Sequence, residues 1–218
     1  GRRLWLKAEP LQITGSFKFR GACSAISTLS DEARSRGVIA YSSGNHAQGI
    51  ALAATLFKTR ATIVMPHDAP ANKVANTRAY GADVVHYERG VESREDIGAD
   101  FAKKHGLTLI KPYDDPAVIA GQGTVGLELS DQIAELGLSV SAVLCCCGGG
   151  GLSAGIATAM AATHPDVTLY TVEPEGFDDT ARSLSLGKRV ANKTEQGSIC
   201  DAIVTPSPGE LTFPILKA

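Results

Sequence analysis

Short apolar runs alternate with stretches of helical spacing along the whole chain, and this alternation most narrows the possible folds. Strand-like runs occupy residues 4–9, 37–43, 61–66, 83–88, 107–113, 140–147, 167–173 and 201–205. Helical spacing occurs at residues 17–29, 45–57, 72–80, 93–105, 123–136 and 152–163. Such alternation builds β-α-β units, so the sequence predicts an α/β fold with a largely parallel sheet. Runs such as AVLCC and ATIVM are apolar at successive positions, which predicts helices on both sheet faces.

One weak boundary divides the chain. At PYDDP, residues 112–116, two prolines flank two aspartates. We therefore expect a small domain over residues 38–116 and a discontinuous large domain formed by residues 1–37 and 117–218. The chain begins at Gly1 and stops at LTFPILKA without a closing turn, so we expect a longer protein truncated at both ends.

Charge and composition exclude several classes of partner. The 218 residues hold 21 basic and 23 acidic side chains without long runs of one sign, so we expect no nucleic-acid or membrane partner. Apolar stretches such as residues 49–57 are shorter than the roughly 18 residues that span a bilayer. Five cysteines, three of them adjacent, do not resemble a secreted disulfide framework. These features predict a cytoplasmic protein with a small-molecule partner.

The stretch LCCCGGGGLSAG, residues 144–155, joins an apolar run to a helix start through four glycines. A strand, a glycine loop and a helix N-terminus point free N–H groups at one spot, which favours binding of a phosphate group. The same residues fit the G-x-G-x-x-A dinucleotide pattern, with Glu173 placed as a ribose-binding acid. A structural tight turn is the third interpretation.

The three cysteines before the glycines do not form a metal site by this pattern. Adjacent strand residues point to opposite faces, so Cys145 and Cys147 face one way and Cys146 the other. Three such thiols cannot converge on one tetrahedral ion. We interpret them as small packing residues of a central strand.

TGSFKFRGA, residues 14–22, places Lys18 at the start of a helical stretch between Phe17 and Phe19. A helix N-terminus and partial desolvation both lower the pKa of a lysine, which makes its amine a better nucleophile for a Schiff base. An ordinary solvated lysine at a helix start is the alternative.

YSSGNHAQG, residues 41–49, leads from an apolar run into an apolar helix. Its hydroxyls and backbone N–H groups make a second anion site, suited to an amino-acid carboxylate. The alternative is an ordinary N-cap by Ser43 or Asn45, with His46 as a helix-start residue.

Taken together, the motifs GSFKFRGA, SSGNHAQG, AGQGTVGLEL, CGGGGLSAG and VEPEG resemble the fold-type II pyridoxal-phosphate enzymes, within them the serine/threonine dehydratase and serine racemase family. The resemblance covers nearly the whole chain in order. It implies a two-domain α/β fold similar to the tryptophan synthase β chain, with parallel-rich twisted sheets flanked by helices. It also implies a homodimer.

The resemblance assigns roles residue by residue. Lys18 would form the Schiff base with pyridoxal 5'-phosphate, Phe17 would pack beside the cofactor ring, and Asn45 would bind its phenolic oxygen. Backbone N–H groups would hold the cofactor phosphate at Gly148, Gly149, Gly150, Gly151 and Leu152. The residues implied for the substrate are Ser42, Ser43, Gly44, Asn45 and His46 at its carboxylate, and Thr205.

The implied activity is β-elimination from a hydroxy amino acid such as L-serine or L-threonine, which yields a 2-oxo acid and ammonia. The cofactor stabilises the carbanion and Lys18 is the natural base. Ser43 matches a serine that acts on the opposite face of the carbanion in racemases, so serine racemase is the alternative within the family. From other classes, an NAD-dependent oxidoreductase or a non-catalytic amino-acid-binding fragment stays open.

VEPEGFDD, residues 172–179, is a candidate site for a metal ion. In some relatives a Glu and an Asp six residues apart, with a carbonyl between them, hold Mg²⁺ or Ca²⁺. Here these ligands map to Glu173, Asp179 and the carbonyl of Phe177, all hard oxygen donors. A solvated acidic loop is the alternative.

The chain departs from the family at Cys146 and Cys147, where relatives carry a proline-valine pair.

Overall fold

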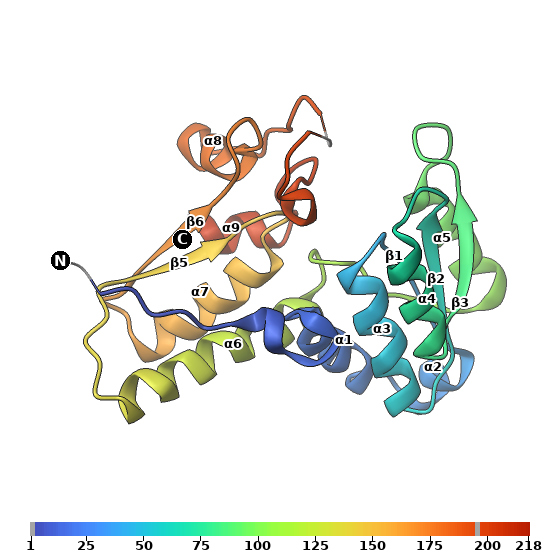
Figure 1. Ribbon diagram of the computed structural model, residues 1–218, viewed down its shortest axis with the longest axis horizontal. Coiled ribbons are helices and arrows are strands. Elements are labelled where there is room, and N and C mark those ends of the chain that lie inside the picture. Colours follow the sequence, from blue (N-terminus) through green and yellow to red (C-terminus); the bar gives the residue numbers. More distant parts are fainter. Residues whose placement is uncertain (1–2, 195–196) are drawn as a thin grey trace.

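The computed structural model describes residues 3–194 and 197–218 as two α/β bodies with α1 (Lys18–Ser27) between them (Figure 1). The helices that follow are α2 (Asp31–Arg36), α3 (Asn45–Leu56), α4 (Ala71–Ala79), α5 (Arg94–His105), α6 (Pro116–Glu135), α7 (Gly151–Thr163), α8 (Asp179–Leu186) and α9 (Thr212–Lys217). The strands are β1 (Val38–Tyr41), β2 (Ala61–Pro66), β3 (Asp83–Tyr87), β4 (Thr108–Leu109), β5 (Ala142–Cys146) and β6 (Thr168–Val172). Short 3-10 turns lie at η1 (Glu9–Leu11), η2 (Ile13–Gly15) and η3 (Asp201–Ile203).

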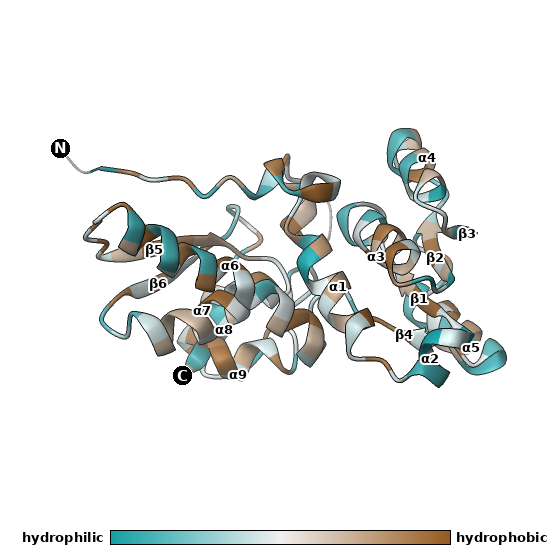
Figure 2. Cartoon of the chain, turned by 90° about the horizontal axis from the view of Figure 1, so that it is seen from below, coloured by the Kyte–Doolittle hydropathy of each residue, from teal (hydrophilic) through white to brown (hydrophobic). Residues whose placement is uncertain are grey.

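A four-stranded sheet forms the body on the right of Figure 1. Its strand order is β3-β2-β1-β4 and every pairing is parallel, as the alternation of apolar runs and helices predicted. Val38 and Ala40 point into a core shared with α1 and α3, whereas Ile39 and Tyr41 point toward α5. Helices therefore cover both faces of this sheet, and Figure 2 shows hydrophilic residues on the outer turns of α5.

The second sheet pairs β5 with β6 in parallel. Cys145 and Val143 pack against α7, but the opposite face is open among the described residues, with Leu144 63% and Tyr170 53% exposed. The prediction that helices cover both faces of the AVLCC strand is therefore wrong for the structure described. Apolar residues at successive positions indicate that the strand is hydrophobic. They do not indicate which elements pack on its two faces.

Two predicted strands are absent from the structure. Residues 4–9 run as an extended segment without a ladder partner until η1 begins at Glu9, and residues 201–205 contain η3. A strand needs a neighbour for its backbone hydrogen bonds, and apolar residues alone do not supply one. Helices α2, α8 and α9 lay outside the predicted segments, and α6 begins at Pro116 rather than at residue 123. Asp115 caps it by accepting from the N–H groups of Ala117 and Val118.

Glycines bring α1, α6 and α7 into close contact at the centre of the molecule. A Cβ on Gly155 would lie 2.5 Å from the carbonyl oxygen of Ile119 and 2.6 Å from the amide nitrogen of Gly123. A Cβ on Gly121 would lie 2.6 Å from the carbonyl oxygen of Arg20 in α1. These neighbours are backbone atoms, so the helices can approach this closely only where the contact positions carry no side chain.

None of the helices in residues 3–194 and 197–218 is long and apolar enough to cross a membrane.

We therefore expect Gly155→Ala to lower the free energy of unfolding by about 2 kcal/mol, because the added methyl meets backbone that cannot turn aside. Gly98→Ala in α5 is the matched control, since its Cβ would lie 3.1 Å from the Tyr41 side chain, which can move. The control should shift stability by less than about 1 kcal/mol, with the gain in helix propensity offsetting the contact. Equal losses in urea unfolding would contradict this account.

Candidate active site

Lys18 lies at the first position of α1, where the two bodies meet. Its Nζ donates a hydrogen bond to the carbonyl oxygen of Pro112 at 2.6 Å and lies 5.4 Å from the centre of the Phe17 ring. Protein atoms surround the amine, and this burial lowers the pKa of Lys18 from 10.5 to about 8. A sizeable fraction of the amine is therefore uncharged near neutral pH, which is the form that attacks a carbonyl carbon.

His46 stands beside this lysine in the first turn of α3. It is 2% exposed, and its Nε2 lies 3.1 Å from the carbonyl oxygen of Ile110. Because a carbonyl only accepts, we assign the proton to Nε2, which leaves the buried Nδ1 without a partner among the described residues. Burial, with the charge of Lys18, lowers the pKa of His46 to about 3. His46 is thus a neutral hydrogen-bond donor at physiological pH.

The loop between β1 and α3 carries the serines and the asparagine of SSGNHAQG. Ser42 Oγ accepts from the Gly44 N–H at 3.1 Å, and the first turn of α3 has no side-chain cap. The N-cap alternative for Ser43 and Asn45 is therefore not what the structure contains. The uncapped N–H groups and the helix dipole leave a positive end at the carboxyl edge of the sheet.

Residues 110–114, the crossover from the four-stranded body to α6, pass through the centre of this site. The carbonyl oxygen of Ile110 lies 3.1 Å from His46 Nε2, and that of Pro112 accepts from Lys18 Nζ at 2.6 Å. Farther along, Asp114 Oδ1 accepts from the Leu211 N–H at 2.8 Å. One short segment thus contacts both bodies and the C-terminal turn.

Tyr113, the next residue of this crossover, packs its ring on the glycine loop. A Cβ on Gly149 would collide with the ring, and one on Gly151 would lie 2.9 Å from the Tyr113 Cβ. Burial raises the pKa of Tyr113 to about 12, so the phenol stays protonated. Tyr113 was not among the predicted site residues, although it lies between the two prolines of the boundary motif PYDDP.

The rest of the glycine loop is equally close to its own chain. Gly150 has φ +91°, which favours glycine, and a Cβ there would lie 2.8 Å from Thr212 Oγ1. A Cβ on Gly148 would lie 3.1 Å from the Cα of Ile203 and 3.4 Å from Cγ2 of Thr205. Thr205 therefore lies against the loop, with its Oγ1 buried and unpartnered among the described residues.

An anion fits the start of α7. This helix of 13 residues has Gly150 as N-cap, has no side-chain cap, and carries Leu152 in its first turn. Its free N–H groups and dipole suit a phosphate. With the buried amine of Lys18 they form a donor set that fits pyridoxal phosphate, which needs one amine for its aldehyde and one cradle for its phosphate.

The carboxylate of Glu173 caps the start of α8. Its two carboxylate oxygens accept from the N–H groups of Thr180 and Ala181, each at 2.8 Å. It is therefore not a free acid for a ribose, which removes the support it gave to the dinucleotide interpretation. Asp179 is fully buried; its Oδ1 accepts from Asn192 Nδ2 at 2.6 Å, and its Oδ2 has no partner within the described residues.

Burial, together with the charge of Glu173, raises the pKa of Asp179 to about 6. Phe177 is buried in the turn between these two acids. No cluster of three or more histidine, cysteine or acidic side chains in the described ranges could hold a metal ion. Of the four acids in this segment, Glu173 and Asp179 thus form a pair of interacting carboxylates, and Asp179 Oδ2 has no partner among the described residues.

The cysteines alternate as strand geometry requires. Cys145 and Cys147 are buried and Cys146 is exposed. Ser153 Oγ donates to Cys145 Sγ at 3.3 Å, and Cys147 Sγ lies 3.4 Å from Thr180 Oγ1. Burial raises the pKa of Cys145 to about 12, so this thiol stays protonated.

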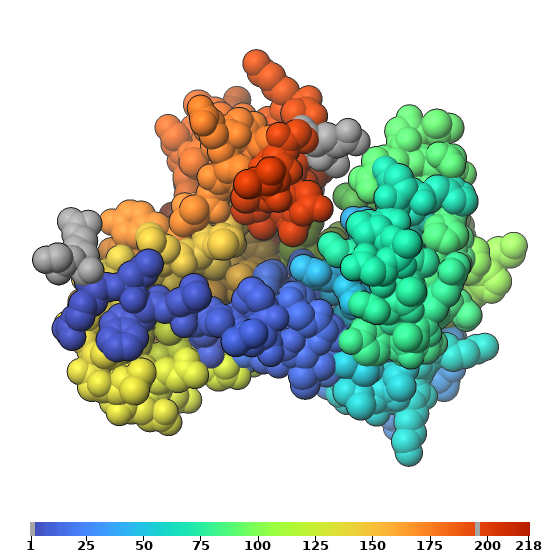
Figure 3. Space-filling view, viewed as in Figure 1, coloured from blue at the N-terminus to red at the C-terminus, as the bar shows by residue number. Residues whose placement is uncertain are grey.

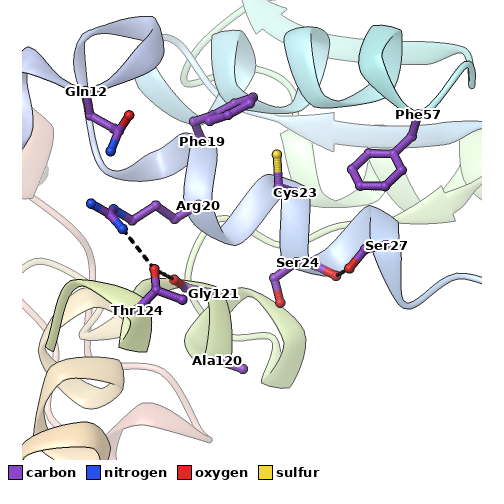
Figure 4. A pocket seen from close by; sticks show the side chains of 10 residues that line it. All are labelled: Gln12, Phe19, Arg20, Cys23, Ser24, Ser27, Phe57, Ala120, Gly121 and Thr124. Atoms are coloured by element: carbon purple, nitrogen blue, oxygen red, sulfur yellow. Dashed lines mark hydrogen bonds between the residues drawn. The ribbon is translucent and has the colours of Figure 1, made fainter. Parts of the chain in front are cut away.

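Two hollows on the surface are not lined by Lys18. One of about 510 Å³ runs between α1 and α6, and Figure 4 shows its lining, with Arg20 donating to Thr124. The Arg20 guanidinium is already paired with Glu9 and Glu128, at 2.9 and 2.6 Å. This hollow thus offers no unpaired charge. Figure 3 shows the dark blue N-terminal residues between the yellow part of the chain and the green and cyan body.

Comparison with known proteins gives the same picture over the whole chain. Residues 1–218 match the model of the family described as pyridoxal-phosphate dependent enzyme. The chain is 51% identical to an L-threo-3-hydroxyaspartate ammonia-lyase of a Pseudomonas species and 48% identical to one of Saccharomyces cerevisiae, in each case over 100% of this chain. It spans 66% and 65% of their lengths.

Solved structures agree. A threonine deaminase from T.th. superimposes with a TM-score of 0.92 at 49% identity, covering 100% of this chain and 69% of that one. A serine racemase from Dictyostelium discoideum gives 0.87 at 39% identity, covering 96% and 66%. The family model, the relatives and the α/β fold with a buried lysine lead to one conclusion. The chain belongs to the pyridoxal-phosphate dependent enzymes, within the group that includes threonine dehydratases, hydroxyaspartate ammonia-lyases and serine racemases.

Proposed function

We propose that the protein is an ammonia-lyase that removes the β-hydroxyl and the amino group of a hydroxy amino acid, giving a 2-oxo acid and ammonia. The observation that carries this proposal is the buried amine of Lys18, whose pKa falls to about 8 at a site with two uncapped helix N-termini. The similar proteins that are named for eliminations of this type support it.

Lys18 has two tasks in this proposal. Its amine would hold the aldehyde group of the cofactor, and the same amine would take the proton from the substrate Cα. In the structure the carbonyl oxygen of Pro112 accepts a hydrogen bond from this amine, which orients it. Bound pyridoxal phosphate supplies the electron sink for the charge left at Cα. Because Lys18 is surrounded by protein, little water competes for this proton.

The two helix starts divide the anionic groups between them. The start of α7, from Gly148 to Leu152, would hold the cofactor phosphate, and residues 42–46 would receive the substrate carboxylate. Phe17 would lie beside the cofactor ring, Asn45 would bind its phenolic oxygen, and Thr205 would touch the substrate. We propose residues 38–116 as the small domain and residues 1–37 with 117–218 as the large one, closing on the substrate between them.

Among hydroxy amino acids, L-serine and L-threonine are the proposed substrates, and the names of the curated relatives add L-threo-3-hydroxyaspartate. Serine racemase is a second candidate, favoured by the presence of Ser43 and by the likeness to serine racemase structures. Ser43 would act on the face of Cα opposite to Lys18. The homodimer and the cytoplasmic compartment stay predictions.

Borohydride reduction of the yellow holoenzyme should fix the cofactor to the peptide that contains Lys18. Lys18→Ala should lose this label and lower kcat by about a thousandfold or more, because both attachment and proton transfer depend on one amine. Lys111→Ala, a neighbouring lysine of the crossover segment, is the control and should be labelled as wild type.

Mass spectrometry locates the label, and the release of 2-oxo acid and ammonia from L-serine measures the activity. Formation of D-serine would favour the racemase. A label on another lysine, or a colourless protein that binds NAD, would contradict the proposal.

We further propose that Glu173, Asp179 and the carbonyl of Phe177 bind Mg²⁺ or Ca²⁺. The orphaned Oδ2 of Asp179 and the second carboxylate beside it support this site, since two close carboxylates favour a cation. The raised pKa of Asp179 fixes the pH dependence. Below about 6 the acid carries a proton that competes with the cation, so binding should weaken as pH falls through that value.

Adding Ca²⁺ or Mg²⁺ to chelator-treated protein should raise Tm by several degrees at a pH well above the Asp179 pKa and much less at a pH below it. Asp179→Asn should abolish this dependence. Asp178→Asn, at a half-buried neighbour whose carboxylate pairs with Arg182 at 3.0 Å, should retain it. No effect of either ion on Tm at the higher pH would overturn the cation site.

A further inference from the structure

Lys73 reaches the substrate loop from the next helix. Helices α3 and α4 both begin at the carboxyl edge of the four-stranded sheet, following β1 and β2, so their N-termini are neighbours (Figure 1). A Cβ on Gly44 would lie 3.0 Å from Lys73 Nζ, 3.2 Å from its Cδ and 3.5 Å from its Cε. The end of the lysine side chain therefore lies along the bare backbone of Gly44.

The ammonium of Lys73 brings charge that no neighbour neutralises. Lys73 is half-buried, and no acidic side chain in the described residues pairs with its Nζ. By contrast, Arg89 in the same body pairs with Asp68 at 3.1 Å. The uncapped start of α3 adds the positive end of its dipole at the same place. Two positive features side by side favour an anion between them.

His46 in the first turn of α3 adds no charge to this end of the helix. Its Nε2 is bound to Ile110, and its Nδ1 is an acceptor without a partner in the described part of the chain. Since His46 stays neutral, it neither neutralises Lys73 nor competes for the anion. The cofactor phosphate belongs to the start of α7 in the other body, so it is not the anion for this position.

We propose that Lys73 is a substrate-binding residue whose ammonium pairs with the α-carboxylate of the amino acid held on residues 42–46. This inference rests on the proposed function. It assigns selectivity for free amino acids over their amides to one side chain, because only a carboxylate gains from the charge. Gly44 is glycine here because a side chain would push the ammonium away from the loop.

The test compares L-serine with L-serinamide, which has the same amine and hydroxyl but no carboxylate. Each is titrated into the holoenzyme and followed by the absorbance change of the cofactor. Lys73→Met should weaken L-serine binding about tenfold, the size of one charge-assisted hydrogen bond, and L-serinamide binding less than about twofold. Lys73→Arg should restore L-serine affinity to within about threefold of wild type.

Lys58→Met is the matched control, since Lys58 follows α3 at its far end, is exposed, and should leave both affinities unchanged. Equal weakening of both ligands by Lys73→Met, or no weakening of either, would overturn the inference while leaving the proposed function intact. A wild-type holoenzyme whose absorbance responds to neither ligand would contradict the proposed function, and this inference with it.

Discussion

The properties of the candidate active site depend on the burial of the Lys18 amine. Lys18 donates to the Pro112 carbonyl at the point where α1 lies between the two bodies, and the surrounding protein lowers its pKa to about 8. Burial disfavours the charged form of the amine, so the share of the uncharged nucleophile near neutral pH is larger than for a lysine in water. The same burial keeps His46 neutral. The burial that makes the Lys18 amine reactive thus also keeps its neighbour His46 uncharged.

The crossover at residues 110–114 and the glycine loop form one unit. Tyr113 packs on Gly149 and Gly151, and Thr212 Oγ1 donates to the Gly149 carbonyl at 2.7 Å. The absence of side chains in the loop therefore serves two needs. It admits the protein's own crossover, and it leaves N–H groups at the start of α7 free for an anion. A substitution here would disturb this packing, and with it the phosphate site that we propose.

Much of the fold follows from local pattern. The run at residues 61–66 is β2, and the parallel order of the first sheet follows from β-α-β alternation. The strands predicted at residues 4–9 and 201–205 are absent from the structure. Strand pairing depends on a distant partner, about which a local pattern holds no information. Lys18, Asn45 and Gly150 were visible because short motifs mark helix starts. The contacts of Tyr113 with Gly149 and Gly151, and of Lys73 with Gly44, were not predicted, because they join residues that lie far apart along the chain.

The central claim is that burial, not a neighbouring charge, lowers the pKa of Lys18. The most direct measurement is the pH titration of Lys18 by NMR in cofactor-free protein, with ¹³C-methyl groups attached to its lysines and Lys18→Arg to assign the signal. This account predicts a midpoint of about 8, unchanged by high salt because desolvation is not screened. A midpoint near 10.5, the ordinary lysine value, would contradict it.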